Sequence, residues 1–114
     1  MGMPSMSIML HEITKALHYA KATDVVYIRI GTSGGLGCPP GSVVITETAV
    51  DGALNPFHTS MILGKPVKRP ANFDKFIVQE LASCALEGED IVIGNTMACD
   101  DFYEGQARLD GAIW

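Results

Sequence analysis

A short stretch of this 114-residue chain places an arginine directly before a glycine-rich loop. Arg29 interrupts the apolar run 25–30, and the following residues 31–37 contain four glycines together with the hydroxyls of Thr32 and Ser33. Glycine lets a backbone turn sharply and expose its N–H groups, and a guanidinium removed from water needs an anion beside it. The stretch therefore predicts a cradle for an oxyanion; the alternative is a simple glycine turn with Arg29 paired to a carboxylate.

The glycine spacing differs from two common phosphate-binding loops. No Gly-Lys-Ser/Thr follows, so the stretch is not a Walker A loop. Pro39 and Pro40 stand where a dinucleotide-binding fingerprint would begin its helix, so it is not that fingerprint either. By itself the glycine pattern leaves the oxyanion cradle and the simple turn equally open.

Residues 100–108 form a second stretch with chemistry-bearing side chains, and three interpretations compete for it. Asp100, Asp101 and Glu104 suggest a metal site of a hydrolase. Adjacent carboxylates usually point apart and no histidine is near in the sequence, which disfavours this interpretation. A solvated acidic loop is the second interpretation.

The third interpretation of residues 100–108 is a loop that recognises a nucleobase. The carboxamide of Gln106 offers one acceptor and two donors, which match the edge of an imide or amide ring. Arg108 follows two residues later, so an extended loop would put it on the same side, and its guanidinium suits a carbonyl oxygen that gains negative charge. Phe102 adds a flat apolar face for a sugar or base.

Hydrophobic patterning predicts where the strands lie. Continuous apolar or β-branched runs predict strands over residues 25–30, 43–48 and 90–95, with a further short strand over 60–63. Residues 64–70 alternate cations with prolines and predict a solvated loop. Both chemical stretches thus follow the carboxyl ends of strands, where open α/β sheets bind ligands.

Two segments show helical spacing of apolar residues. One covers residues 5–21 with Ser5 as its N-cap, and the other covers 73–86 with Asn72 as its cap. His11 and His18 lie seven residues apart on the first helix, where polar surface positions are favoured over a metal pair. The order is helix, strand, strand, helix, strand. The strands are continuously apolar, which indicates a sheet covered on both faces and predicts an α/β sandwich.

Length and composition restrict the class of protein. A chain of 114 residues suffices for one small domain. The net charge of −5, with only eight Lys and Arg residues, argues against nucleic acid as a partner. No apolar run approaches the roughly 20 residues that span a bilayer, and no signal peptide is recognised, so we expect no membrane association. Three widely spaced cysteines favour reduced cytosolic thiols over a disulfide framework or zinc site.

Taken together, these motifs resemble the uridine phosphorylases of the nucleoside phosphorylase superfamily, in their animal type. Residues 29–37 resemble the phosphate and ribose loop, 101–111 resemble the uracil-recognition loop, and 1–12 resemble the start of the helix that precedes the phosphate loop. The resemblance implies that residues 1–114 form a single partial domain, the central part of a three-layer α/β sandwich with a mixed, mostly buried sheet. Family members are longer at both ends.

The resemblance also implies an activity, the reversible phosphorolysis of uridine to uracil and ribose 1-phosphate in pyrimidine nucleoside salvage. It assigns Arg29 and Thr32 to phosphate, with Thr32 also close to the ribose. Ser33 and Gly34 would lie along the base. Phosphate is a co-substrate, and neither a metal nor another cofactor is implied.

For the base, the resemblance assigns three residues. Phe102 would pack on the nucleoside, while Gln106 and Arg108 would bind the uracil edge and act as the catalytic residues. Arg108 would stabilise the negative charge that develops on departing uracil, and Gln106 would reject cytosine.

The resemblance further implies a cytoplasmic homodimer or larger homo-oligomer. Preference for uridine over deoxyuridine or thymidine stays open. The alternative function is a truncated paralogue or fragment that binds a nucleobase or phosphate without turnover.

Overall fold

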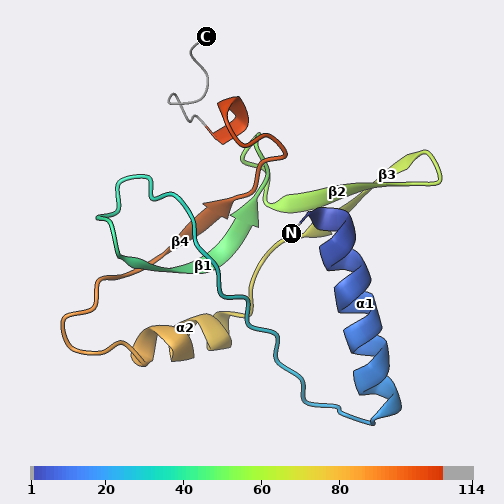
Figure 1. Cartoon of the computed structure of the whole chain (residues 1–114), viewed down its shortest axis with the longest axis horizontal. Coiled ribbons are helices and arrows are strands. Elements are labelled where there is room, and N and C mark those ends of the chain that lie inside the picture. The colour runs from blue at the N-terminus through green and yellow to red at the C-terminus, as the bar shows by residue number, and fades with distance from the viewer. Residues whose placement is uncertain (1, 107–114) are drawn as a thin grey trace. The chain divides into compact units, whose positions relative to one another are not determined.

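The structure, a computed structural model, describes residues 2–106 and divides the chain into two compact units, residues 1–34 and 35–114 (Figure 1). The first unit holds α1 (Met3–Tyr19), and the second holds β1, β2, β3, α2, β4 and a short 3₁₀ turn, η1. None of the helices within residues 2–106 is long and apolar enough to cross a membrane.

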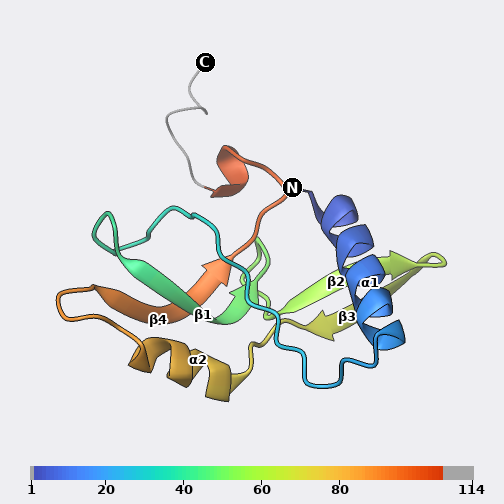
Figure 2. The same cartoon turned by 60° about the horizontal axis from the view of Figure 1, so that its bottom comes forward.

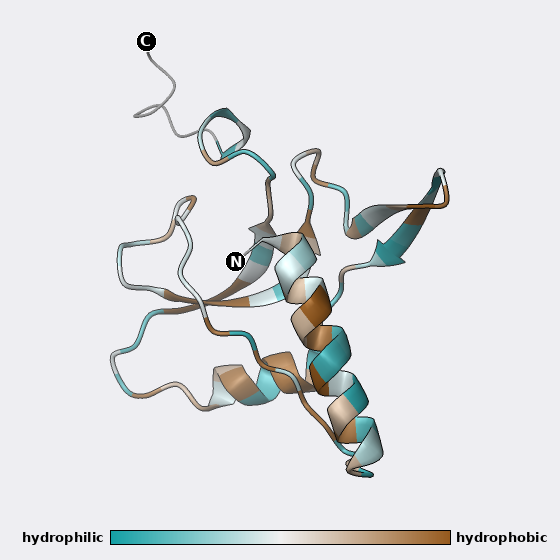
Figure 3. Cartoon of the chain, turned by 45° about the vertical axis from the view of Figure 1, so that its right-hand side comes forward, coloured by the Kyte–Doolittle hydropathy of each residue, from teal (hydrophilic) through white to brown (hydrophobic). Residues whose placement is uncertain are grey.

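Helix α1 begins two residues earlier than the periodicity predicts. Gly2 occupies the N-cap position without a side-chain cap, and Pro4, which fits the first turn because its missing N–H has no partner there, helps to start the helix. The predicted cap, Ser5, is therefore wrong: it lies inside the first turn. An exposed apolar stripe runs along the helix among polar residues (Figure 3).

The carboxyl end of α1 is closed by a Schellman motif. The N–H of Ala22 donates to the carbonyl of Leu17, and the N–H of Lys21 donates to the carbonyl of His18, both at 3.0 Å. Lys21 takes the left-handed conformation that this motif requires, with a φ of 58°.

The strand predicted over residues 25–30 does not form in the structure. The segment is extended but carries no ladder, and Val26, Ile28 and Ile30 expose 58%, 57% and 92% of their surface. A strand is defined by pairing, so β-branched residues alone leave an extended segment when no neighbouring strand bonds to it.

The second unit is built on a parallel pair of strands, β1 (Val43–Val50) and β4 (Ile91–Met97). The register pairs Val43 with Ile91 and shifts once, between Thr46 and Thr48. The Thr46 and Thr96 hydroxyls lie 2.7 Å apart across the pair. The strands predicted over 43–48 and 90–95 are thus confirmed, and both extend two residues further at their carboxyl ends.

Helix α2 (Lys75–Ser83) packs against the β1–β4 pair (Figure 2). Its Val78 is 4% exposed and is the buried apolar residue of the described chain. Asp74, rather than the predicted Asn72, caps the helix by accepting bonds from the N–H groups of Phe76 and Ile77 at 2.9 and 3.1 Å. Asn72 instead bridges to Thr48 at the edge of β1.

A β-hairpin forms the remainder of the second unit and extends away from the β1–β4 pair in both Figure 1 and Figure 2. Strand β2 (Phe57–Ile62) pairs antiparallel with β3 (Lys65–Pro70) around a two-residue turn in which Leu63 and Gly64 have φ values of 50° and 75°. The loop predicted over residues 64–70 is therefore wrong.

The prolines of β3 are compatible with a strand because of their place in the ladder. The two-residue turn makes Ile62–Lys65 a hydrogen-bonded pair, so Pro66 and Pro70 fall at the alternate positions, whose N–H sites face outward. Proline thus removes no bond from this hairpin and instead blocks the outer edge of β3.

The α/β class predicted from the sequence is confirmed. Residues 2–106 contain one parallel and one antiparallel two-stranded sheet. Most residues of β1 and β4 have intermediate burial and none is fully buried, whereas most residues of β2 and β3 are exposed.

Candidate functional site

The carboxyl ends of β1 and β4 open into two neighbouring loops. The N–H of Ala98 donates to the carbonyl of Val50 at 2.9 Å, which continues the parallel pairing one step past both strands. Residues 51–56 leave from β1 and residues 98–106 leave from β4. Because ligands of open α/β sheets bind outside the carboxyl ends of parallel strands, this end of the second unit is the candidate site.

The loop after β1 is organised by one carboxylate. Asp51 Oδ1 accepts bonds from the N–H groups of Ala53 and Asn55, both at 2.9 Å, and the Asn55 carboxamide donates to both Asp51 oxygens at 3.2 and 3.1 Å. The backbone and side-chain donors of Asn55 contribute most to lowering the pKa of Asp51 below 3.8, because hydrogen bonds to a carboxylate favour its charged form.

The loop after β4 is closed by bonds to a single glycine. The N–H of Gly105 donates to Asp101 Oδ2 at 2.6 Å, and the Cys99 thiol donates to the Gly105 carbonyl at 2.8 Å. The 3₁₀ turn η1 (Glu104–Gln106) ends this loop, with the N–H of Gln106 donating to the carbonyl of Tyr103 at 3.2 Å. The loop is therefore ordered by its own side chains.

The predicted base-binding residues lie partly on this loop. Phe102 is 56% exposed, and its ring meets that of Tyr103 edge to face with centroids 5.2 Å apart. Gln106 is exposed at the end of η1. Arg108 lies outside the described residues. The structure thus brings Phe102 and Gln106 onto one ordered loop, and their predicted contacts with a nucleoside stay predictions.

The predicted anion-binding residues belong to the first unit. The Arg29 guanidinium folds back over Gly31: a side chain there would place its Cβ 3.0 Å from both terminal nitrogens of Arg29. Thr32, Ser33 and Gly34 follow as an exposed stretch without regular secondary structure. Within residues 2–106 no carboxylate pairs with Arg29, so the alternative of an intramolecular ion pair is not observed there.

The metal-site interpretation of the acidic loop finds no structural support. Asp101 accepts a bond from the Gly105 N–H, and residues 2–106 contain no group of three His, Cys, Asp or Glu side chains placed to hold a metal ion.

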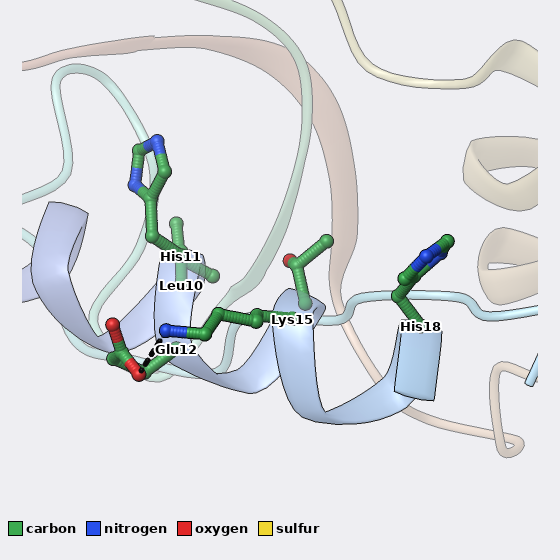
Figure 4. A pocket seen from close by; sticks show the side chains of 6 residues that line it. Leu10, His11, Glu12, Lys15 and His18 are labelled. Atoms are coloured by element: carbon green, nitrogen blue, oxygen red, sulfur yellow. Dashed lines mark hydrogen bonds and ion pairs between the residues drawn. The ribbon is translucent and has the colours of Figure 1, made fainter. Parts of the chain in front are cut away.

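A hollow along α1 is lined by Leu10, His11, Glu12, Thr14, Lys15 and His18 (Figure 4). There His11 Nδ1 bonds the carbonyl of Ser7 at 2.7 Å.

The sequence interpretation missed the residues that shape these loops. From the sequence, Asp101 is a possible metal ligand or a member of a uracil-recognition loop and Cys99 is a reduced thiol, whereas in the structure both side chains bond Gly105. For Asp51 the sequence carries a signal, because an Asp directly before a glycine favours a turn in which the carboxylate bonds the backbone two residues on.

Comparison with known proteins supports the family that the motifs suggest. Uridine phosphorylase 1 of Mus musculus is 51% identical over 115 residues, which cover 99% of this chain and 37% of that protein. The inactive uridine phosphorylase B of Schistosoma mansoni is 43% identical, covering 98% of this chain and 39% of that protein. The chain therefore spans well under half the length of these relatives.

A solved structure agrees with the sequence matches. Uridine phosphorylase from Schistosoma mansoni in complex with uracil is 52% identical and superposes with a TM-score of 0.90, covering 99% of this chain and 40% of that one. The model of the phosphorylase superfamily matches residues 1–113. Because that match takes in nearly the whole sequence, this chain belongs to the phosphorylase superfamily.

Proposed function

We propose that this chain is part of a uridine phosphorylase, which converts uridine and phosphate reversibly to uracil and ribose 1-phosphate. The observation that carries the proposal is the ordered loop after β4, which ends in Gln106 at the carboxyl end of a parallel strand pair. Identity of about half to the mouse enzyme over this whole chain supports it. The activity is proposed rather than established because the chain spans 37% of that relative.

The chemistry requires few protein groups. A phosphate oxygen attacks C1′ of the ribose, the bond from C1′ to N1 of the base breaks, and uracil leaves with the electron pair. Phosphate is already an anionic nucleophile, so the site needs donors that position it rather than a base that activates it. Arg29 and Thr32 take this role in the proposal, and no metal or further cofactor is needed.

The departing base needs stabilisation of its negative charge. In the proposal Arg108 places its guanidinium against a uracil carbonyl where charge develops, and Gln106 bonds the imide edge. Ser33 and Gly34 lie along the base and Phe102 packs on the nucleoside. Cytosine presents a donor where uracil has an acceptor, so it leaves buried polar groups unpaired and is rejected.

We further propose a cytoplasmic location, a role in pyrimidine nucleoside salvage and assembly as a homodimer or larger homo-oligomer. The three free thiols of Cys38, Cys84 and Cys99 are compatible with a reducing compartment.

The test is phosphate-dependent turnover. The purified chain is mixed with uridine and phosphate, and loss of nucleoside absorbance and formation of ribose 1-phosphate are followed against a phosphate-free control. In parallel, a hybrid protein is made in which residues 1–114 replace the matching segment of the mouse enzyme. The mouse enzyme supplies the remaining length of this hybrid. Turnover by either protein supports the proposal; an inactive hybrid that is folded contradicts it. Thymidine and deoxyuridine, tested alongside, define the sugar and base range.

A non-catalytic binding protein is the second candidate, and one observation favours it. A relative described as inactive is 43% identical over nearly the whole chain, so this degree of similarity is compatible with loss of turnover. The two candidates separate in the same experiment, because the second predicts that uracil binds to the hybrid while no ribose 1-phosphate forms.

A further inference from the structure

We infer that Asp101 and Cys99 are positioning residues for nucleobase recognition, because together they hold Gly105, the residue before Gln106, by both its N–H and its C=O. The inference deepens the proposed function and rests on it, since it takes Gln106 as the residue that bonds the base.

The two bonds reach Gly105 from the first part of the same loop. Asp101 Oδ2 accepts the Gly105 N–H at 2.6 Å, a short bond strengthened by the charge of the carboxylate. The Cys99 Sγ donates to the Gly105 carbonyl at 2.8 Å. Asp101 and Cys99 thus close residues 99–105 into a loop in which one side chain binds the Gly105 N–H and the other binds the Gly105 carbonyl.

These bonds determine how the chain enters Gln106. The Gly105 N–H belongs to the peptide group before its Cα, and the carbonyl belongs to the planar peptide group shared with the N–H of Gln106. That N–H donates in turn to the Tyr103 carbonyl at 3.2 Å. With both flanking peptide groups held, φ and ψ of Gly105 are restricted, although glycine is otherwise the most permissive residue. The backbone of Gln106 is therefore oriented before any ligand binds.

Close packing explains why a glycine occupies this position. A Cβ on Gly105 would lie 3.1 Å from the Cβ of Asp101 and 3.5 Å from that of Cys99. Gly52 of the neighbouring loop lies close to Cys99, since a Cβ built on Gly52 would be 3.6 Å from the Cys99 sulfur. Gly52 follows Asp51, whose carboxylate organises that loop. The two loops at the carboxyl ends of β1 and β4 therefore lie close to one another at Cys99.

The test measures uracil affinity by calorimetry in the hybrid of residues 1–114 with the mouse enzyme, and in variants of that hybrid that are altered in residues 99–106. Asp101→Ala removes the acceptor and is expected to weaken uracil binding about tenfold. Asp101→Asn keeps an acceptor oxygen and is expected to recover most of the affinity. Asp100→Ala removes an adjacent exposed carboxylate and serves as the matched control with unchanged affinity. Cys99→Ala likewise removes the thiol donor, and Cys99→Ser is its conservative counterpart because serine retains a donor.

A kinetic readout separates positioning from general damage. Where turnover is measured, Asp101→Ala is expected to raise the KM for uridine and leave the KM for phosphate unchanged. An equal rise in the KM for uridine and in the KM for phosphate would contradict the inference. So would unchanged uracil affinity in Asp101→Ala, which would leave the proposed function intact. If the unaltered hybrid is folded but binds no uracil under conditions in which the mouse relative does, the proposed function fails and this inference fails with it.

Discussion

The carboxylate of Asp51 is bound on both oxygens by Asn55, which donates its backbone N–H at 2.9 Å and its carboxamide N–H groups at 3.2 and 3.1 Å. This four-residue closure sits where β1 ends and fixes the direction in which the chain leaves the parallel strands. It also makes the loop sensitive to acid, because the bonds favour the ionised carboxylate.

The pH dependence of stability is the first prediction. The pKa of Asp51 in the folded protein lies below 3.8, so its contribution to stability is present above pH 3.8 and is lost as pH falls through the lower folded value. We expect the Tm to fall with acid in this range, and Asp51→Asn to make the decline less steep. Thermal unfolding followed by circular dichroism between pH 2.5 and 6, roughly the span of carboxylate titration, measures this. An identical decline in Asp51→Asn and in the control Asp100→Asn would rule it out.

Much of the second unit could be predicted from the sequence, because its signals are local. The apolar runs of β1 and β4 and the periodicity of α2 locate these elements within a few residues. The β3 segment could not be predicted in the same way: proline and lysine indicate a loop by composition, and only the register shows that Pro66 and Pro70 avoid the hydrogen-bonded positions. Strand formation there depends on the partner, β2.

The extended segment 25–30 of the first unit and the loops of the second unit could not be predicted from local signals. Residues 25–30 have strong strand propensity and stay unpaired, because a ladder needs a second strand that propensity does not supply. In the candidate site of the second unit, the residue types point to Gln106, while the bonds from Asp101 and Cys99 to Gly105 depend on loop geometry that periodicity does not encode.

The N-cap of α2 provides the second prediction. Asp74 satisfies two N–H groups at the start of the helix, so Asp74→Ala is expected to lower the free energy of unfolding by about 1 kcal/mol. Urea unfolding monitored by circular dichroism gives the difference. Asn72→Ala is the comparison, because the sequence favours Asn72 as the cap while the structure places it at the edge of β1. A larger loss for Asn72→Ala than for Asp74→Ala would refute the assignment of the cap.

The third prediction concerns the outer edge of β3. Pro66 and Pro70 withhold two N–H groups from that edge without weakening the hairpin, so replacing both by threonine opens the edge to a further strand. We expect the double variant to associate with increasing concentration while the hairpin itself is retained. Analytical ultracentrifugation measures the association, and Ser60→Thr, a change on the paired strand β2, controls for added threonine. A double variant that associates no more than the control would count against this role for the prolines.

The fourth prediction tests the charge that develops on the base. Arg108→Ala is expected to lower kcat about a hundredfold in the active hybrid, comparable to the loss of one donor that acts in the transition state. Arg69→Ala removes the same side chain from the exposed strand β3 and is expected to leave turnover unchanged. Steady-state phosphorolysis of uridine measures both. Equal rates in Arg108→Ala and Arg69→Ala would remove Arg108 from the proposed mechanism.

The fifth prediction follows from the contact of Arg29 with Gly31. A methyl group on Gly31 would meet the guanidinium at 3.0 Å, and because that group ends a flexible side chain it can move away at little cost to folding. Gly31→Ala is therefore expected to displace Arg29 and raise the KM for phosphate by about tenfold, the effect of one weakened charged hydrogen bond, with the Tm nearly unchanged. Gly94→Ala, on β4 with open space around its Cα, is the matched control. If Gly31→Ala binds phosphate as tightly as Gly94→Ala does, the position of Arg29 over Gly31 has no part in binding the anion.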